Sequence, residues 1–128
     1  MKKKTREIIV NGKKYLYVIN QKYYQEKSEI ILKISFEKTK NITCTFRFIT
    51  WEDAITGSPL LMGVRLKKRD VEEIENFNLH HPSQINKFIT NAIDNGWNGE
   101  SVVEFDGLDI MSQLGFEVLW LKPRNQNN

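Results

Sequence analysis

The chain has little cysteine, little histidine and no long apolar run. Its single cysteine, Cys44, cannot form a disulfide within the chain, and stable disulfides are mainly a feature of oxidising compartments. No window reads as a secretory signal, and none reaches the run of about 18 apolar residues that a membrane-spanning helix needs. These absences predict a cytoplasmic protein that does not enter a membrane.

Residue types that carry out chemistry are also sparse. His80 and His81 are the only histidines, and neighbouring side chains point in different directions, so the two cannot chelate a metal together. We instead expect His81 or Ser83 to bond free backbone N–H groups where a helix begins. The seven glycines form no phosphate-binding pattern, and neither Gly-x-Ser-x-Gly nor His-Glu-x-x-His occurs. The sequence therefore indicates no catalytic residue, no metal ligand and no cofactor, which favours a non-catalytic protein.

The length of 128 residues suits one compact domain, because a chain of this size buries enough surface to fold without disulfides or metals. We predict a single domain over residues 1–122 and a disordered polar tail over residues 123–128, which contain few apolar groups. The basic residues 1–4 are expected to be a frayed end.

Charge is distributed unevenly along the chain. Residues 1–50 contain 12 Lys/Arg and 4 Asp/Glu, a net charge of +8, whereas residues 51–128 contain 7 Lys/Arg and 12 Asp/Glu, a net charge of −5. An acidic stretch without Lys or Arg runs from Trp97 to Glu117, and its five acids are Glu100, Glu104, Asp106, Asp109 and Glu117. A surface of one sign steers a partner of the opposite sign. These acids are therefore a candidate surface for a protein partner, for example in an immunity-type protein that caps a basic toxin.

Alternating apolar residues predict several strands. The segment TREIIVNGKKYLYVI contains two β-rich runs joined by Asn11-Gly12, which suits a type I′ hairpin because both turn positions need a positive φ. In residues 30–36 and 42–48 every second residue is apolar, which predicts an antiparallel pair with one buried face. Cys44 lies on that apolar face, so we expect a buried thiol rather than a nucleophile.

The middle of the chain is less clear. Every second residue from Leu60 to Leu66 is apolar, which predicts a fifth strand. Residues 70–79 fit two structures. Asp70 followed by Glu73 is typical of a helix cap, but a polar edge strand fits nearly as well.

The clearest helix begins at Pro82, which suits a first turn because its missing N–H is not needed there. Apolar residues then recur at helical spacing: Ile85, Phe88, Ile89, Ala92 and Ile93. Gly96 and Trp97 have the chemistry of a Schellman ending, so we predict a helix over residues 82–95.

A second, shorter helix is predicted over residues 107–114. It begins at Asp106 as the cap and ends at Gly115, before a strand at residues 116–121. The alternative is a hairpin turn at Asp106-Gly107, because the preceding residues 102–105 read as a strand.

Together these elements predict an α+β fold. A mostly antiparallel sheet of five to seven strands carries one main amphipathic helix, over about residues 82–95, on one face. The short helix over residues 107–114 is the second helical element.

The loop TWEDAITGSPL offers a candidate loop site at Trp51, Glu52 and Asp53. General acid–base catalysis needs two carboxylates that converge from different elements with separated pKa values, which adjacent residues rarely provide. An ordinary loop explains these residues as well, so an enzyme is the least favoured function.

The basic first half supports another alternative, a nucleic-acid-binding module. Tyr15, Tyr17, Tyr23 and Tyr24 lie among lysines, and aromatic rings beside lysines can stack on bases and neutralise phosphates. However, Tyr15 and Tyr17 also fit a core, and the acidic second half repels phosphate. Contact with a protein partner is therefore the first hypothesis.

The segment HPSQINKFITNAIDNGW resembles a set of small bacterial proteins in which a proline-started amphipathic helix ends in Asn-Gly-Trp. The matching positions are Pro82, Ile85, Phe88, Ile89, Ala92, Gly96 and Trp97. The resemblance implies the helix and its ending, and it implies no activity, cofactor or partner. The sequence by itself identifies neither the partner nor the oligomeric state.

Overall fold

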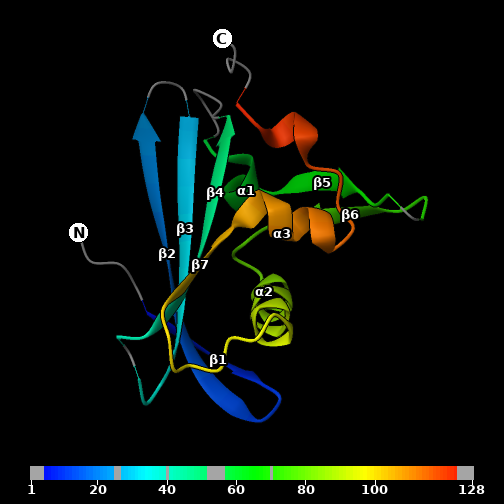
Figure 1. Ribbon diagram of the computed structural model, residues 1–128. Helices are drawn as coiled ribbons and strands as arrows, with labels where there is room; N and C mark the ends of the chain where they lie inside the picture. Colours follow the sequence, from blue (N-terminus) through cyan, green and yellow to red (C-terminus); the bar gives the residue numbers. More distant parts are fainter. Residues whose placement is uncertain (1–4, 25–26, 40, 52–56, 70, 124–128) are drawn as a thin grey trace.

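The computed structural model describes residues 5–24, 27–39, 41–51, 57–69 and 71–123, and these residues form an α+β fold (Figure 1). Five strands make one sheet in the order β1-β2-β3-β4-β7, and their bounds are Arg6–Val10, Lys13–Tyr24, Lys27–Phe36, Thr43–Trp51 and Val103–Asp106. A separate sheet pairs β5 (Val64–Lys67) with β6 (Ile74–Phe77). The helical elements of this part of the chain are α1 (Pro59–Met62), α2 (Pro82–Asp94), α3 (Gly107–Gln113) and the 3₁₀ turn η1 (Leu119–Leu121).

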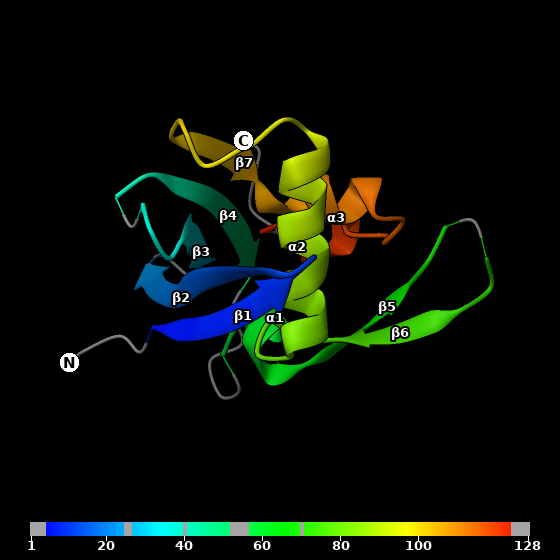
Figure 2. The ribbon, with the colours of Figure 1, turned by 90° about the horizontal axis from the view of Figure 1, so that it is seen from below.

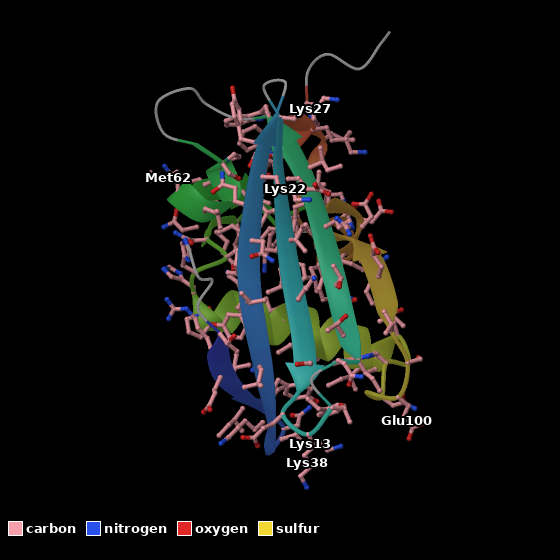
Figure 3. The ribbon with its side chains drawn as sticks, turned by 90° about the vertical axis from the view of Figure 1, so that its left-hand side faces the viewer. Lys13, Lys22, Lys27, Lys38, Met62 and Glu100 are labelled. Atoms are coloured by element: carbon pink, nitrogen blue, oxygen red, sulfur yellow. The ribbon has the colours of Figure 1, made fainter. Side chains whose placement is uncertain are left out.

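The large sheet is mixed, with one covered face and one open face. β1 to β4 pair antiparallel, whereas β7 runs parallel to β4 with Arg47 opposite Asp106. The large sheet is thus mostly but not purely antiparallel, because a long crossover containing α2 brings β7 alongside β4 in the same direction. The expected single sheet is corrected, because β5 and β6 form a sheet of their own. The helices lie on one face of the sheet in Figure 1. Figure 3 looks onto the opposite face, which no helix covers in the described residues.

The predicted hairpin and the alternating strands are confirmed. Asn11 and Gly12 have φ angles of 53° and 79°, and β1 pairs with β2 on either side of them. The covered face of β3 and β4 is fully buried at Ile30, Leu32, Ile34, Cys44, Phe46 and Phe48. Burial raises the pKa of the Cys44 thiol to about 12, so the thiol stays protonated at neutral pH.

An aromatic cluster holds α2 against the covered face. The Phe88 ring meets the rings of Phe46 and Phe48 edge-on, at centroid distances of 5.1 and 5.4 Å. Such edge-to-face pairs add to the free energy that comes from burying the rings. Figure 2 shows α2 beside the large sheet, with β5 and β6 extending away from both.

The two ends of α2 can be compared with the ends predicted from the sequence. The Trp97 N–H donates to the Ala92 carbonyl at 3.0 Å and the Gly96 N–H to the Ile93 carbonyl at 2.9 Å, which is the expected Schellman motif. At the other end, His81 occupies the cap position without any side-chain hydrogen bond to the helix, so its expected capping role is wrong. A single main helix is not confirmed either, because α2 is one of three described α-helices.

Two predicted strands are corrected, and of the one predicted from Leu60 to Leu66 only the second half forms, as β5. Residues 59–62 form α1 because the Ser58 hydroxyl accepts a hydrogen bond from the Leu60 N–H at 3.3 Å and Pro59 occupies the first turn. The strand predicted at residues 116–121 is reduced to one bridge between Phe116 and Lys68, followed by η1. For residues 70–79 a helix and a strand both fitted the sequence, and the structure has the strand β6 there.

Some expectations fall on residues outside the described part of the chain. These are the frayed end at residues 1–4, the cap at Asp70 and residues 124–128 of the predicted tail. The single domain over residues 1–122 stays a prediction.

Candidate functional site

A notch opens at the edge of the large sheet because β7 is shorter than β4. Pairing between these strands stops at Arg47 and Asp106, whereas β4 continues to Trp51. Lys122 and Pro123 of the C-terminal segment lie beyond the end of β7. An open hollow of about 710 Å³ remains between these two residues and the strands β4 and β7. We call this hollow the notch, and its lining consists of Lys27, Arg47, Ile49, Glu104, Phe105, Asp106, Leu108, Lys122 and Pro123.

The start of α3 forms one wall of the notch. Its predicted cap is confirmed, because a carboxylate oxygen of Asp106 accepts hydrogen bonds from the N–H groups of Leu108 and Asp109 at 3.0 and 3.2 Å. This excludes the alternative hairpin. Gly107 lets the helix lie directly on β4, since a Cβ at this position would be 2.4 Å from the Phe48 ring. α3 begins at this residue, so the pairing of β7 with β4 extends no further than Arg47.

A three-residue ion cluster lies along the open face beside the notch. The Arg47 guanidinium bonds the Glu104 carboxylate and, at 3.0 Å, the Glu29 carboxylate. These hydrogen bonds raise the pKa of Arg47. One guanidinium faces two carboxylates, so the cluster keeps a net charge of −1. The contacts fix Glu104 at the rim of the notch.

Two exposed apolar side chains stand beside the notch. Leu119 is 79% exposed and Trp120 is 50% exposed, although the adjacent Leu121 is fully buried and anchors the turn. The Trp51 indole N–H donates to the Trp120 carbonyl at 2.8 Å, and the two tryptophan rings are 6.0 Å apart. We call Leu119 and Trp120 the ridge. The hydrogen bond from Trp51, the last residue of β4, holds the ridge against the sheet.

Charge in the notch is separated along β4. Glu104 and Asp106 lie on β7 beside Arg47 and give that end of the notch a net negative charge, whereas Lys27 pairs in register with Trp51 at the far end of β4. Lys122 enters the lining from the C-terminal segment. Figure 3 shows Lys27 at the end of the open face where the C-terminal segment lies. Apolar atoms of Ile49 lie between the two charged ends.

The five predicted acids are not all in one place. Glu104 and Asp106 line the notch, and Asp109 follows in the exposed first turn of α3. Glu100 lines a different hollow together with Lys13 and Lys38, and Figure 3 places it at the opposite end of the sheet from Lys27. Glu117 is exposed, and its backbone N–H bonds the Lys67 carbonyl at 2.9 Å.

The candidate loop site is only partly described. Trp51 ends β4 and supports the ridge, while Glu52 and Asp53 lie outside the described residues. Sequence reasoning missed the ridge, because it assigned residues 116–121 to a strand in which Leu119 and Trp120 would face opposite sides.

The basic N-terminal strands present few of the aromatic rings that nucleic-acid binding would use. Tyr15 and Tyr17 are 1% and 5% exposed, so neither can stack on a base, whereas Tyr23 is exposed. Lys14 lies between two carboxylates, those of Glu7 and Glu37, at 3.8 and 3.7 Å. These contacts leave fewer free groups on this surface than the sequence suggested.

Comparison of the chain with protein-family models, with curated proteins and with solved structures found no match. Within the described residues, no group of three or more His, Cys, Asp or Glu side chains is arranged to hold a metal ion. In the same part of the chain no helix is long and apolar enough to cross a membrane.

Proposed function

We propose that this protein is a non-catalytic binding module that docks a protein partner at the notch and the ridge. The observation that carries the proposal is the exposure of Leu119 and Trp120 on a turn that Trp51 and the buried Leu121 hold in place. Tryptophan is among the residues most enriched at the energetic centres of protein interfaces. Because Trp51 bonds the Trp120 carbonyl and its ring lies beside the Trp120 ring, the turn is already ordered before binding, which lowers the entropy lost on association.

The notch supports the same function. It combines apolar groups with charges of both signs, as the surfaces of non-obligate protein interfaces do. Two of the predicted acids, Glu104 and Asp106, line it. An immunity-type role against a basic toxin is one form of this proposal, with these acids facing the toxin. We place the role in the cytoplasm, where the free and buried Cys44 needs no partner.

The test is quantitative affinity capture from cells that naturally contain the protein. The bait is used unchanged and as Trp120→Ala, and Met62→Ala serves as the matched control. Met62 is also exposed, at 59%, but lies at the opposite edge of the sheet in Figure 3.

We expect one partner to be retained by the unchanged bait and by Met62→Ala, and to fall by about tenfold or more with Trp120→Ala. Equal recovery by all three baits would contradict the proposal, and so would the absence of any enriched protein at low salt. Circular dichroism of the purified baits verifies that each one is folded.

A further inference from the structure

Beyond the protein partner, we infer that the hollow lined by Lys13, Lys38 and Glu100 binds a small phosphate ester that carries a ring, of the nucleoside monophosphate kind. We call it the lysine hollow. The β1–β2 turn, the end of β3 with the turn after it, and the loop after α2 form it. Its volume of about 510 Å³ suits a ligand of this size. Figure 3 shows its three labelled residues at the end of the sheet away from Lys27 and the notch.

Two cations of the lysine hollow are unmatched. Lys14 also lines the hollow, but its ammonium lies between the carboxylates of Glu7 and Glu37, at 3.8 and 3.7 Å. Among the described residues, no ion pair involves Lys13 or Lys38. A phosphate ester carries a charge of about −1.5 to −2 at pH 7. It therefore matches two ammonium groups better than a carboxylate, with its single charge, does.

The Phe36 ring supplies an apolar wall of the same hollow. It is half-buried and stacks on the rings of Tyr15 and Trp97 at centroid distances of 4.8 and 5.4 Å, which fix its orientation. The Lys13 ammonium lies over the Phe36 ring, 5.9 Å from its centroid. A phosphate bound by Lys13 therefore brings the ring attached to it close to Phe36, and flat rings pack favourably on aromatic side chains.

Two polar groups fit the rest of such a ligand. Thr39 lines the hollow next to Lys38, and its hydroxyl is shielded from solvent without a hydrogen-bond partner in the described part of the chain. A buried hydroxyl without a partner is unfavourable, and a phosphate oxygen held by Lys38 would give it an acceptor. The Glu100 backbone N–H donates to the Asn98 side chain at 3.0 Å. The Glu100 carboxylate repels phosphate but accepts hydrogen bonds from sugar hydroxyls, so it favours a nucleoside over a bare anion.

The probe is adenosine monophosphate (AMP), titrated into the full-length protein labelled with ¹⁵N and followed by the NMR shifts of backbone amides. We expect saturable shifts at Lys13, Lys38 and Thr39, with a Kd of about 1 mM or below. Adenosine and ribose 5-phosphate each contain only part of the ligand, so each should bind about tenfold more weakly. Inorganic phosphate or adenosine that binds as tightly as AMP would contradict the inference.

Lysine-to-glutamine variants test the two cations. Lys13→Gln and Lys38→Gln should each weaken AMP binding by about threefold to tenfold, because each removes one ammonium from the phosphate. Lys22→Gln makes the same change in net charge and is the control. Lys22 is exposed and lies toward the other end of the sheet in Figure 3, so its replacement should leave the affinity unchanged. An equal loss in all three variants would reduce binding to general charge attraction and overturn the inference.

Phe36→Leu tests the apolar wall, because it removes the ring and keeps an apolar side chain. It should weaken AMP binding by about threefold to tenfold and leave ribose 5-phosphate binding unchanged; circular dichroism verifies that the variant is folded. An unchanged affinity for AMP would contradict packing of the ligand ring on Phe36. The absence of any shift at residues 13, 38 and 39 with AMP at about 10 mM would refute the site as a whole.

Discussion

Replacing Glu75 tests how the small sheet is attached to the body. One carboxylate oxygen of Glu75 accepts hydrogen bonds from Gln84 and Lys87 of α2 at 2.8 and 2.9 Å, and the other lies 3.3 Å from Lys68. The ammonium groups of Lys68 and Lys87 also lie over the Phe116 ring, at 5.5 and 5.7 Å. Glu75 thereby joins β6 to α2 and to Lys68, and the two lysines extend the contact to Phe116, which follows α3.

The pKa of Glu75 gives the magnitude and the sign. Burial alone would raise this pKa, but the bonds from Gln84, Lys87 and Lys68 outweigh burial and lower it from 4.5 to about 2. Such a shift corresponds to about 3 kcal/mol at 1.36 kcal/mol per pKa unit. The side chain is 28% exposed, and solvent screening reduces the contribution to about 2 kcal/mol. Because the folded-state pKa is lowered, this stability is present above pH 4.5 and is lost as the pH falls toward 2.

The assay is urea denaturation of the unchanged protein and of Glu75→Gln at several pH values. We expect Glu75→Gln to lower the free energy of unfolding by about 2 kcal/mol at pH 7, and the difference to shrink steadily below pH 4.5. Glu73→Gln, an exposed neighbour, is the control and should change it by less than about 0.5 kcal/mol. A difference that is absent at pH 7, or that is as large near pH 2 as at pH 7, would show that the Glu75 carboxylate does not stabilise the fold.

Three further predictions concern the core. Phe88→Ala should lower the free energy of unfolding by about 3 to 5 kcal/mol, because it leaves a cavity among fully buried rings; an unchanged urea midpoint would show that the packing of α2 is wrong. Gly107→Ala should cost about 1 to 3 kcal/mol despite the better helix propensity of alanine, because the new Cβ would meet the Phe48 ring at 2.4 Å; a gain in thermal stability would contradict this contact. Cys44, with a pKa of about 12, should not react with a thiol reagent at pH 8 until the protein unfolds, and immediate reaction in the folded state would disprove its burial.

Local chemistry explains which parts of the fold were predictable. The Asn11-Gly12 turn, the Asp106 cap and the Schellman ending at Gly96 each depend on a few neighbouring residues, so the sequence carries the whole signal. The same holds for the alternation in β3 and β4. α1 was missed although Ser58 and Pro59 are a helix-start signal, because the apolar alternation that follows them favoured a strand.

Remote pairing explains what could not be predicted. Nothing in the residues of β7 shows that they run parallel to β4, since this direction depends on where α2 carries the chain. The notch exists because β4 is longer than β7 and the two strands pair. Since the sequence does not show this pairing, it could not predict the notch either. Charge patterning did point to Glu104 and Asp106, but it grouped them with Glu100, which lies near Lys13 and Lys38.

Site-specific photo-crosslinking inside the native cell tests whether a protein partner docks at the ridge. A photoreactive amino acid is placed at position 119, on the ridge, and in a parallel strain at position 62, whose methionine is exposed at the opposite edge of the sheet. We expect one discrete crosslinked partner from position 119, none from position 62, and loss of the product when Trp120→Ala is added. A product of equal yield from both positions, or no product from position 119, would contradict it.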